Sequence, residues 1–174
     1  MAMSDDELLH GFVSTALPAD QFHHEQHVRV AWLFVRQHGM PTALSEFATA
    51  IKRFADAKGV HGLYHETITW AFVLIIAERL ARKPADAWDT FAADNADLLC
   101  WKPSILDRYY SKDLLASALA RTTFVMPDLL NVEAGLTASA TATASLAEAR
   151  FAREGGSPAS TSRTSRSRRR RRRR

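Results

Sequence analysis

Residues 63–82 read LYHETITWAFVLIIAERLAR, and this stretch decides the fold. It contains eight apolar residues in a row, 70–77, and no Gly or Pro interrupts it. A short apolar run fits a buried helix or a buried strand, but the whole stretch is too long for a typical strand. As a helix it spans about 30 Å, the width of a small domain. We therefore predict a central helix that is buried on most of its faces.

Further helices are predicted on both sides of this stretch. One covers about residues 24–38 and ends at Gly39, and another begins near Pro41 and ends at Gly59. No alternating strand pattern of useful length occurs. The sequence predicts an all-α fold, a single compact bundle of five to seven helices over residues 1–129.

Smaller features complete the predicted body. Ser111 is expected to cap one last helix, whose apolar face includes residues 114, 115, 118 and 119. The tryptophans are expected in the core, because aromatic side chains bury the most apolar surface. They are Trp32, Trp70, Trp88 and Trp101. The single cysteine, Cys100, excludes an intrachain disulfide and is expected to be an inert buried thiol.

Residues 130–174 differ in composition from the rest of the chain. They are rich in Ala, Ser and Thr and end in seven consecutive arginines, 168–174, so we predict a disordered tail. Residues 1–130 hold 12 Lys and Arg against 16 Asp and Glu, whereas residues 131–174 hold 11 Arg against 3 Glu. The basic tail alone is expected to attract nucleic acid or acidic lipid, without sequence preference. The alternative is an unselected extension.

The sequence favours a cytoplasmic protein without membrane insertion. The first residues, MAMSDDELLHGF, are acidic and lack the apolar core of a secretory signal. The apolar run at 70–77 is shorter than the roughly 20 residues that cross a membrane. The oligomeric state stays open.

Histidines at two predicted helix starts suggest a site. His24 and His27 are three residues apart, so they neighbour each other on one helix. His65 and Glu66 open the central helix. His24, His27 and His65 are predicted metal ligands for Zn²⁺ or Fe²⁺. His65 and Glu66 are predicted catalytic residues, with Glu66 as a ligand or a base.

Two other interpretations of these histidines stay open. In the first, the imidazoles form structural hydrogen bonds to the backbone or to Glu66, and Glu66 favours the helix start. In the second, His and Glu perform acid–base chemistry without a metal. Neither the His-x-x-His spacing nor the adjacent His-Glu pair is a specific metal motif.

A second candidate group lies at Arg108, Tyr109 and Tyr110. Together with Lys102, these cations and phenols are able to line an anion or ligand pocket. The alternative is that Arg108 pairs with a surface carboxylate while a tyrosine packs in the core.

The chain also resembles a bacterial family of small all-helical proteins. The resemblance rests on HEQHVRVAWLFVRQHG at 24–39, GLYHETITWAF at 62–72 and the segment 101–129, which includes LDRYYS. It implies a shared helical fold and supplies no activity. The family pattern maps onto His24, His27, Trp32, Tyr64, His65, Glu66, Thr67, Arg108, Tyr109 and Tyr110. Tyr64, Arg108, Tyr109 and Tyr110 are taken as ligand-binding candidates.

Three functional hypotheses follow. The first is metal-assisted or acid–base chemistry on a small molecule, in a pocket between the starts of the second and central helices. The second is a non-catalytic ligand-binding or protein-interaction module. The third is nonspecific nucleic-acid binding, which rests on the arginine tail alone.

Overall fold

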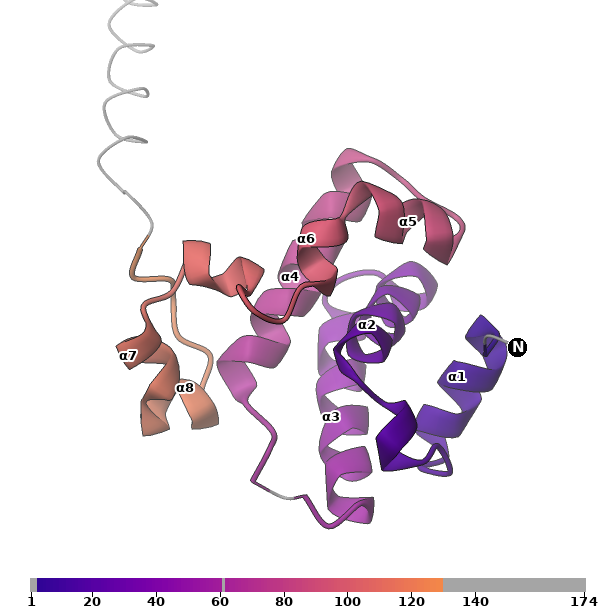
Figure 1. The fold of residues 1–174 in the computed structure, drawn as a ribbon, viewed down its shortest axis with the longest axis horizontal. Helices are drawn as coiled ribbons and strands as arrows, with labels where there is room; N and C mark the ends of the chain where they lie inside the picture. Colours follow the sequence, from indigo (N-terminus) through magenta and orange to yellow (C-terminus); the bar gives the residue numbers. More distant parts are fainter. Residues whose placement is uncertain (1–2, 61, 130–174) are drawn as a thin grey trace, which may run out of the picture. The chain divides into compact units, whose positions relative to one another are not determined.

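The computed structural model describes residues 3–60 and 62–129 of the chain (Figure 1). The chain divides into two units, Met1–Leu130 and Asn131–Arg174. The described residues end at 129, so the predicted disordered tail, residues 130–174, lies outside them. Every regular element described is a helix, which confirms the all-α prediction. The α-helices are α1 (Asp5–Val13), α2 (His24–His38), α3 (Thr42–Ala57), α4 (Glu66–Arg82), α5 (Trp88–Asp94), α6 (Ala96–Leu99), α7 (Lys112–Ala116) and α8 (Ala118–Thr122).

The described residues contain eight α-helices where the sequence predicted five to seven, and two short 3₁₀ helices, Ala19–Gln21 and Ile105–Arg108. The difference arises in the last third of the body. The single helix predicted after Ser111 is two helices, α7 and α8, divided at Ser117. Ser117 is extended, with ψ 149°, and its hydroxyl caps α8 by accepting from the Ala120 N–H.

Local sequence signals set several helix boundaries. Ser4 and Glu7 form a capping box at α1, in which the Glu7 N–H donates to the Ser4 Oγ and the Ser4 N–H donates to the Glu7 carboxylate. Gly39 ends α2 with φ +64°, a left-handed conformation that favours glycine. The central helix begins at Glu66 rather than residue 63, and His65 is its N-cap.

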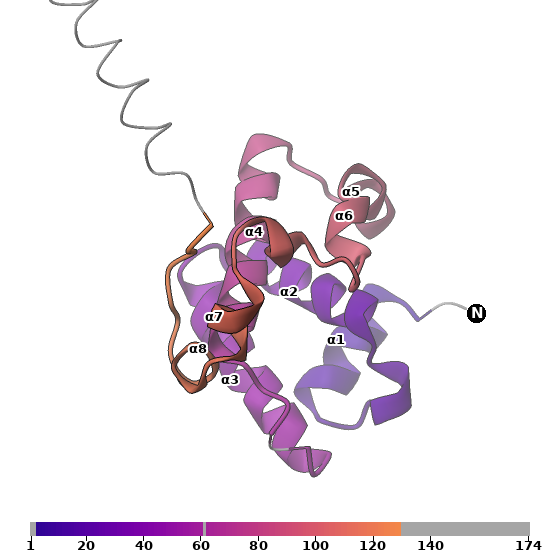
Figure 2. The same cartoon turned by 60° about the vertical axis from the view of Figure 1, so that its left-hand side comes forward.

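Helices α2, α3 and α4 contact one another and form the framework of the described body, with α1 against α2 and α3 (Figures 1 and 2). Phe12 of α1 is fully buried at one end of this framework. Its ring lies 5.0 Å from that of Phe22 and 5.2 Å from that of Phe54, measured between centroids. The aromatic cluster continues to Phe34 and Phe47. Burial of these rings fixes the end of α2 where His24 and His27 lie.

The start of α4 holds the segment that contains α7 and α8. Thr67 is completely buried, and its hydroxyl donates to the Thr123 carbonyl at 2.8 Å and accepts from the Val125 N–H at 3.1 Å. Arg121 donates to the Gly62 carbonyl at 3.0 Å. Helix α8 contacts α4, and α7 contacts α8 (Figure 2). Buried polar groups therefore fasten this segment to α4.

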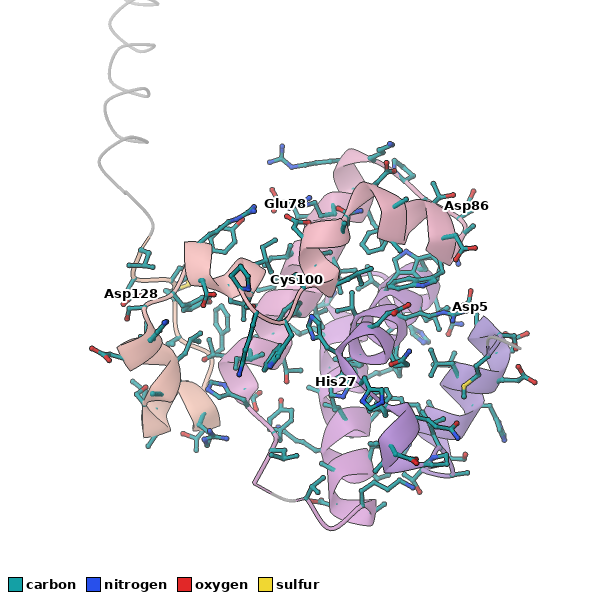
Figure 3. The ribbon with its side chains drawn as sticks, in the orientation of Figure 1. Asp5, His27, Glu78, Asp86, Cys100 and Asp128 are labelled. Atoms are coloured by element: carbon teal, nitrogen blue, oxygen red, sulfur yellow. The ribbon has the colours of Figure 1, made fainter. Side chains whose placement is uncertain are left out.

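Two predictions about burial are wrong. Trp101 is 50 % exposed, and Cys100 is an exposed free thiol, labelled in Figure 3. Both follow α6 in an irregular stretch that turns toward the surface, so no helix face draws them inward. Trp32 and Trp88 are buried as predicted, and Trp70 is partly buried.

Burial of the central helix is narrower than predicted. Ala71, Phe72, Val73 and Ile76 are buried, whereas Leu74 is 38 % exposed. One face of α4 is therefore open, because α2, α3 and α8 cover only the others. Over residues 3–60 and 62–129, no helix is long and apolar enough to cross a membrane.

Candidate functional site

A cavity of about 300 Å³ lies among α2, α3 and α4. Its wall is mainly aromatic and aliphatic, with imidazole, phenol, hydroxyl and ammonium groups at a few points. The lining side chains include Phe22, Val28, Ala31, Phe47, Ile51, Phe54, Ile68, Phe72 and Trp101, together with His24, His27, Lys58, Tyr64, His65 and Thr69. A mostly apolar wall with few polar groups is typical of small-molecule sites.

His24 belongs to the first turn of α2 and lines the cavity. Its Nε2 lies 2.9 Å from the Leu98 carbonyl oxygen. A carbonyl only accepts, so Nε2 carries the proton and Nδ1 is an acceptor. The ring also packs against Phe72 and Trp101. Burial lowers the pKa of His24, against the hydrogen bond to Leu98, which raises it. The imidazole is therefore neutral at pH 7.

His27 lies three residues further along the first turn of α2, beside α3 (Figure 3). Its ring stacks on that of Phe22, with 4.1 Å between centroids. Burial is the main cause that lowers its pKa to about 4, followed by the nearby His24, while a hydrogen bond from the His27 ring to the Phe22 carbonyl opposes the shift. His27 is thus a neutral imidazole at pH 7.

His65 also lines the cavity, but both of its ring nitrogens are already used. Nε2 donates to the Leu115 carbonyl oxygen at 2.8 Å, and Nδ1 accepts from the Ile68 N–H at 3.3 Å. Its exposure is only 7 %. No lone pair is left for a metal or a substrate proton, so His65 caps α4 and holds the segment of α7.

Glu66 is not among the residues that line the cavity. Its carboxylate pairs with the Lys52 ammonium at 3.0 Å, and Lys52 also lies 4.5 Å from the centre of the Tyr64 ring. The Tyr64 hydroxyl is buried without a hydrogen bond to any described residue. Burial, followed by the neighbouring Glu66 carboxylate, raises the pKa of Tyr64 above its usual value. The cavity therefore presents a protonated phenol.

The predicted metal site is not formed by the described residues. His24, His27 and His65 line the same cavity, yet no group of three or more His, Cys, Asp or Glu side chains in residues 3–60 and 62–129 is placed to hold a metal ion. The physical reason lies in the number of free nitrogens: both ring nitrogens of His65 bind the protein, so His24 and His27 alone are left, fewer than the three protein ligands of a typical zinc site.

The second predicted group lies outside the cavity lining. The Arg108 guanidinium pairs with Asp97 at 3.4 Å, and Asp97 also binds Arg79 at 3.1 Å. Tyr110 is 3 % exposed and its hydroxyl donates to the Val125 carbonyl at 3.2 Å. Tyr109 packs partly buried against the core. These contacts match the structural alternative that the sequence left open.

The mouth of the cavity has an apolar rim. Val60, Leu63 and Trp101 line the cavity and are 38 %, 75 % and 50 % exposed, respectively. Lys58 also lines it, and its ammonium is held by the Thr15 carbonyl at 2.8 Å. An apolar molecule in solution therefore meets apolar side chains before it reaches the interior.

Sequence reasoning missed most of the cavity wall. Phe47, Ile51 and Phe54 follow helical spacing on α3, a pattern that is typical of a helix face packed into the core. The same pattern is produced by a stripe that packs tightly and by one that borders a cavity. Only the spacing between α2, α3 and α4 separates the two cases, and residue order does not encode it directly.

The fold and the site together define an all-α domain with an internal, mainly apolar cavity. No family model, no curated protein and no solved structure matches the chain. The resemblance to a bacterial helical family therefore stays a prediction, and the role of the cavity has to be argued from its own geometry.

Proposed function

We propose that this domain is a non-catalytic binding module for a small, mainly apolar molecule, held in the cavity among α2, α3 and α4. The observation that supports it is the cavity itself, about 300 Å³ in volume, walled by aromatic and aliphatic side chains. This volume lies in the range of small-molecule sites. The apolar rim at Leu63 and Trp101 gives such a molecule a route inward.

Binding is favoured over catalysis because of the two residues on which the catalytic hypothesis rested. His65 uses both ring nitrogens within the protein, and Glu66 is paired with Lys52. A general base needs a lone pair within hydrogen-bond reach of its substrate. Nucleic-acid binding by the arginine tail remains a separate prediction on residues outside those described, and it requires no contribution from the cavity.

The ligand is expected to be uncharged. The imidazoles of His24 and His27 are neutral at pH 7, because burial lowers the pKa of both. Tyr64 is protonated, and the Lys58 ammonium belongs to the lining. A cation would lose its hydration without a counter-charge in the described lining, and an anion would meet one ammonium, which already donates to the Thr15 carbonyl. The sequence predicts a cytoplasmic location, so a metabolite-sized, uncharged ring compound is the ligand class that we expect there.

A calorimetric titration with the bicyclic probe benzofuran tests the proposal. Its nine heavy atoms suggest a Kd on the order of 0.1 to 1 mM, a fragment-like affinity. The variant Ile51→Trp, which adds bulk to a lining position, is expected to weaken binding at least about tenfold, since the ring would occupy the cavity.

The matched control is Leu80→Trp. Leu80, like Ile51, is partly buried and packs against the core, but it does not line the cavity. It is expected to leave the affinity unchanged. Absence of binding to the unmodified chain, or equal loss in the two variants, would show that the cavity is not a ligand site.

A further inference from the structure

The polar groups of the cavity differ in what they still have to offer a ligand. His24 donates its only proton, on Nε2, to the Leu98 carbonyl oxygen. His27 is a neutral imidazole, because burial lowers its pKa to about 4. A neutral imidazole has one donor and one acceptor, so each of these two rings keeps an acceptor nitrogen, and His24 keeps no donor. Both rings line the cavity.

Among the other polar groups, His65 is saturated on both nitrogens. The Lys58 ammonium gives one of its three donors to the Thr15 carbonyl, so it adds donors to the lining and no acceptor. The buried Tyr64 hydroxyl is without a partner among described residues and is able to accept as well as to donate. When a ligand displaces water from the cavity, an imidazole acceptor nitrogen is satisfied only if the ligand carries a donor, because an unmade buried hydrogen bond costs free energy.

We infer that the cavity selects uncharged ring compounds that carry a hydrogen-bond donor, an N–H or O–H group, which binds the acceptor nitrogen of His24 or His27. This inference rests on the proposed function and narrows its ligand class. The apolar walls supply affinity for the ring, and the imidazoles supply the preference for a donor over a ring of the same shape without one.

A pair of probes of equal shape tests the inference on the unmodified chain. Indole carries one N–H donor, and benzofuran replaces that group by an ether oxygen. At pH 7.5, indole is expected to bind about five- to tenfold more tightly than benzofuran, the effect of one hydrogen bond in a buried site. Calorimetry measures both constants, and chemical shifts of the imidazole nitrogens identify the acceptor.

Variants assign the preference to a residue. His24→Phe and His27→Phe keep an aromatic ring and remove the acceptor, so the variant at the ligand-binding ring is expected to bring the indole-to-benzofuran ratio close to one. Exposed His10→Phe on α1 is the control and is expected to retain the ratio. A ratio near one in the unmodified chain, or tighter binding of benzofuran, overturns the inference while the proposed function stands. If neither probe binds, both are overturned.

Discussion

The histidines that line the cavity lie at two helix starts, and their rings make different contacts there. At α4, His65 is the N-cap residue, outside the helix, and both ring nitrogens bind the protein. At α2, His24 and His27 lie within the first turn, so their rings project sideways to the cavity and each keeps one acceptor nitrogen. His65 and His24 differ by one position relative to the helix start, and only His24 keeps a nitrogen available to a ligand.

The largest expected effect concerns protonation of His27. Its pKa is about 4 in the folded chain, against 6.5 for an ordinary histidine, because burial disfavours the charged ring. The unfolded state therefore binds the proton more tightly. The stability is complete above pH 6.5, falls as the pH is lowered toward 4, and the loss levels off below that, at about 3 kcal/mol in total.

Urea unfolding at pH 8, 6, 5 and 4 measures this loss. Carboxylates contribute to any acid titration, so the comparison is with His27→Gln, which keeps a neutral donor for the Phe22 carbonyl. The two chains are expected to differ in slope only between pH 6.5 and 4. Parallel curves of unfolding free energy against pH would show that His27 binds protons in the folded state as readily as an exposed imidazole does.

A smaller effect is expected when the two helix starts are compared directly. His65→Ala removes a hydrogen bond to Leu115 and the acceptor for Ile68, both in a nearly buried position. We expect the free energy of unfolding to fall by about 2 kcal/mol. His24→Ala removes one hydrogen bond, to Leu98, at a less buried site, and about 1 kcal/mol is expected.

Chemical unfolding monitored by circular dichroism at pH 7.5 compares these variants. The affinities for indole and benzofuran are measured as well, because His65 contributes no free nitrogen to the cavity and its loss should not affect them differently. His65→Ala is expected to lower stability without changing the ratio of indole to benzofuran affinity. If the two substitutions lower the free energy of unfolding by the same amount, the two helix starts do not differ in the structural role of their histidines.

The comparison also explains what the sequence was able to predict. The apolar run at 70–77 and the turn at Gly39 encode the helices α2 and α4, since helical burial and a positive φ each have a local signature. Cavity-lining His24, His27 and His65 were found because they stand at helix starts. The roles of these residues could not be found in the same way.

The roles of these histidines depend on their hydrogen-bond partners, and those partners lie far away in the sequence. His65 meets Leu115, fifty residues away, and His24 meets Leu98, seventy-four residues away. A sequence pattern contains no information about such carbonyl oxygens. Glu66 was likewise expected near the histidines, but Lys52 of α3 pairs with it instead. No group of three or more ligating side chains among the described residues is placed to hold a metal ion, because His65 already uses both of its ring nitrogens.

The smallest effect tests whether the start of α4 holds the segment of α7 and α8. Thr67→Val keeps the shape of a fully buried side chain and removes the hydroxyl that bridges Thr123 and Val125. Two backbone groups lose a partner, and a loss of about 1 kcal/mol is expected because water is able to reach them when the segment opens. Amide hydrogen exchange is expected to accelerate at Val125 and through α8 while α2 and α3 keep their protection. Uniform acceleration of amide exchange over all helices would mean that Thr67 stabilises the whole core. It would then not hold the segment of α7 and α8 separately.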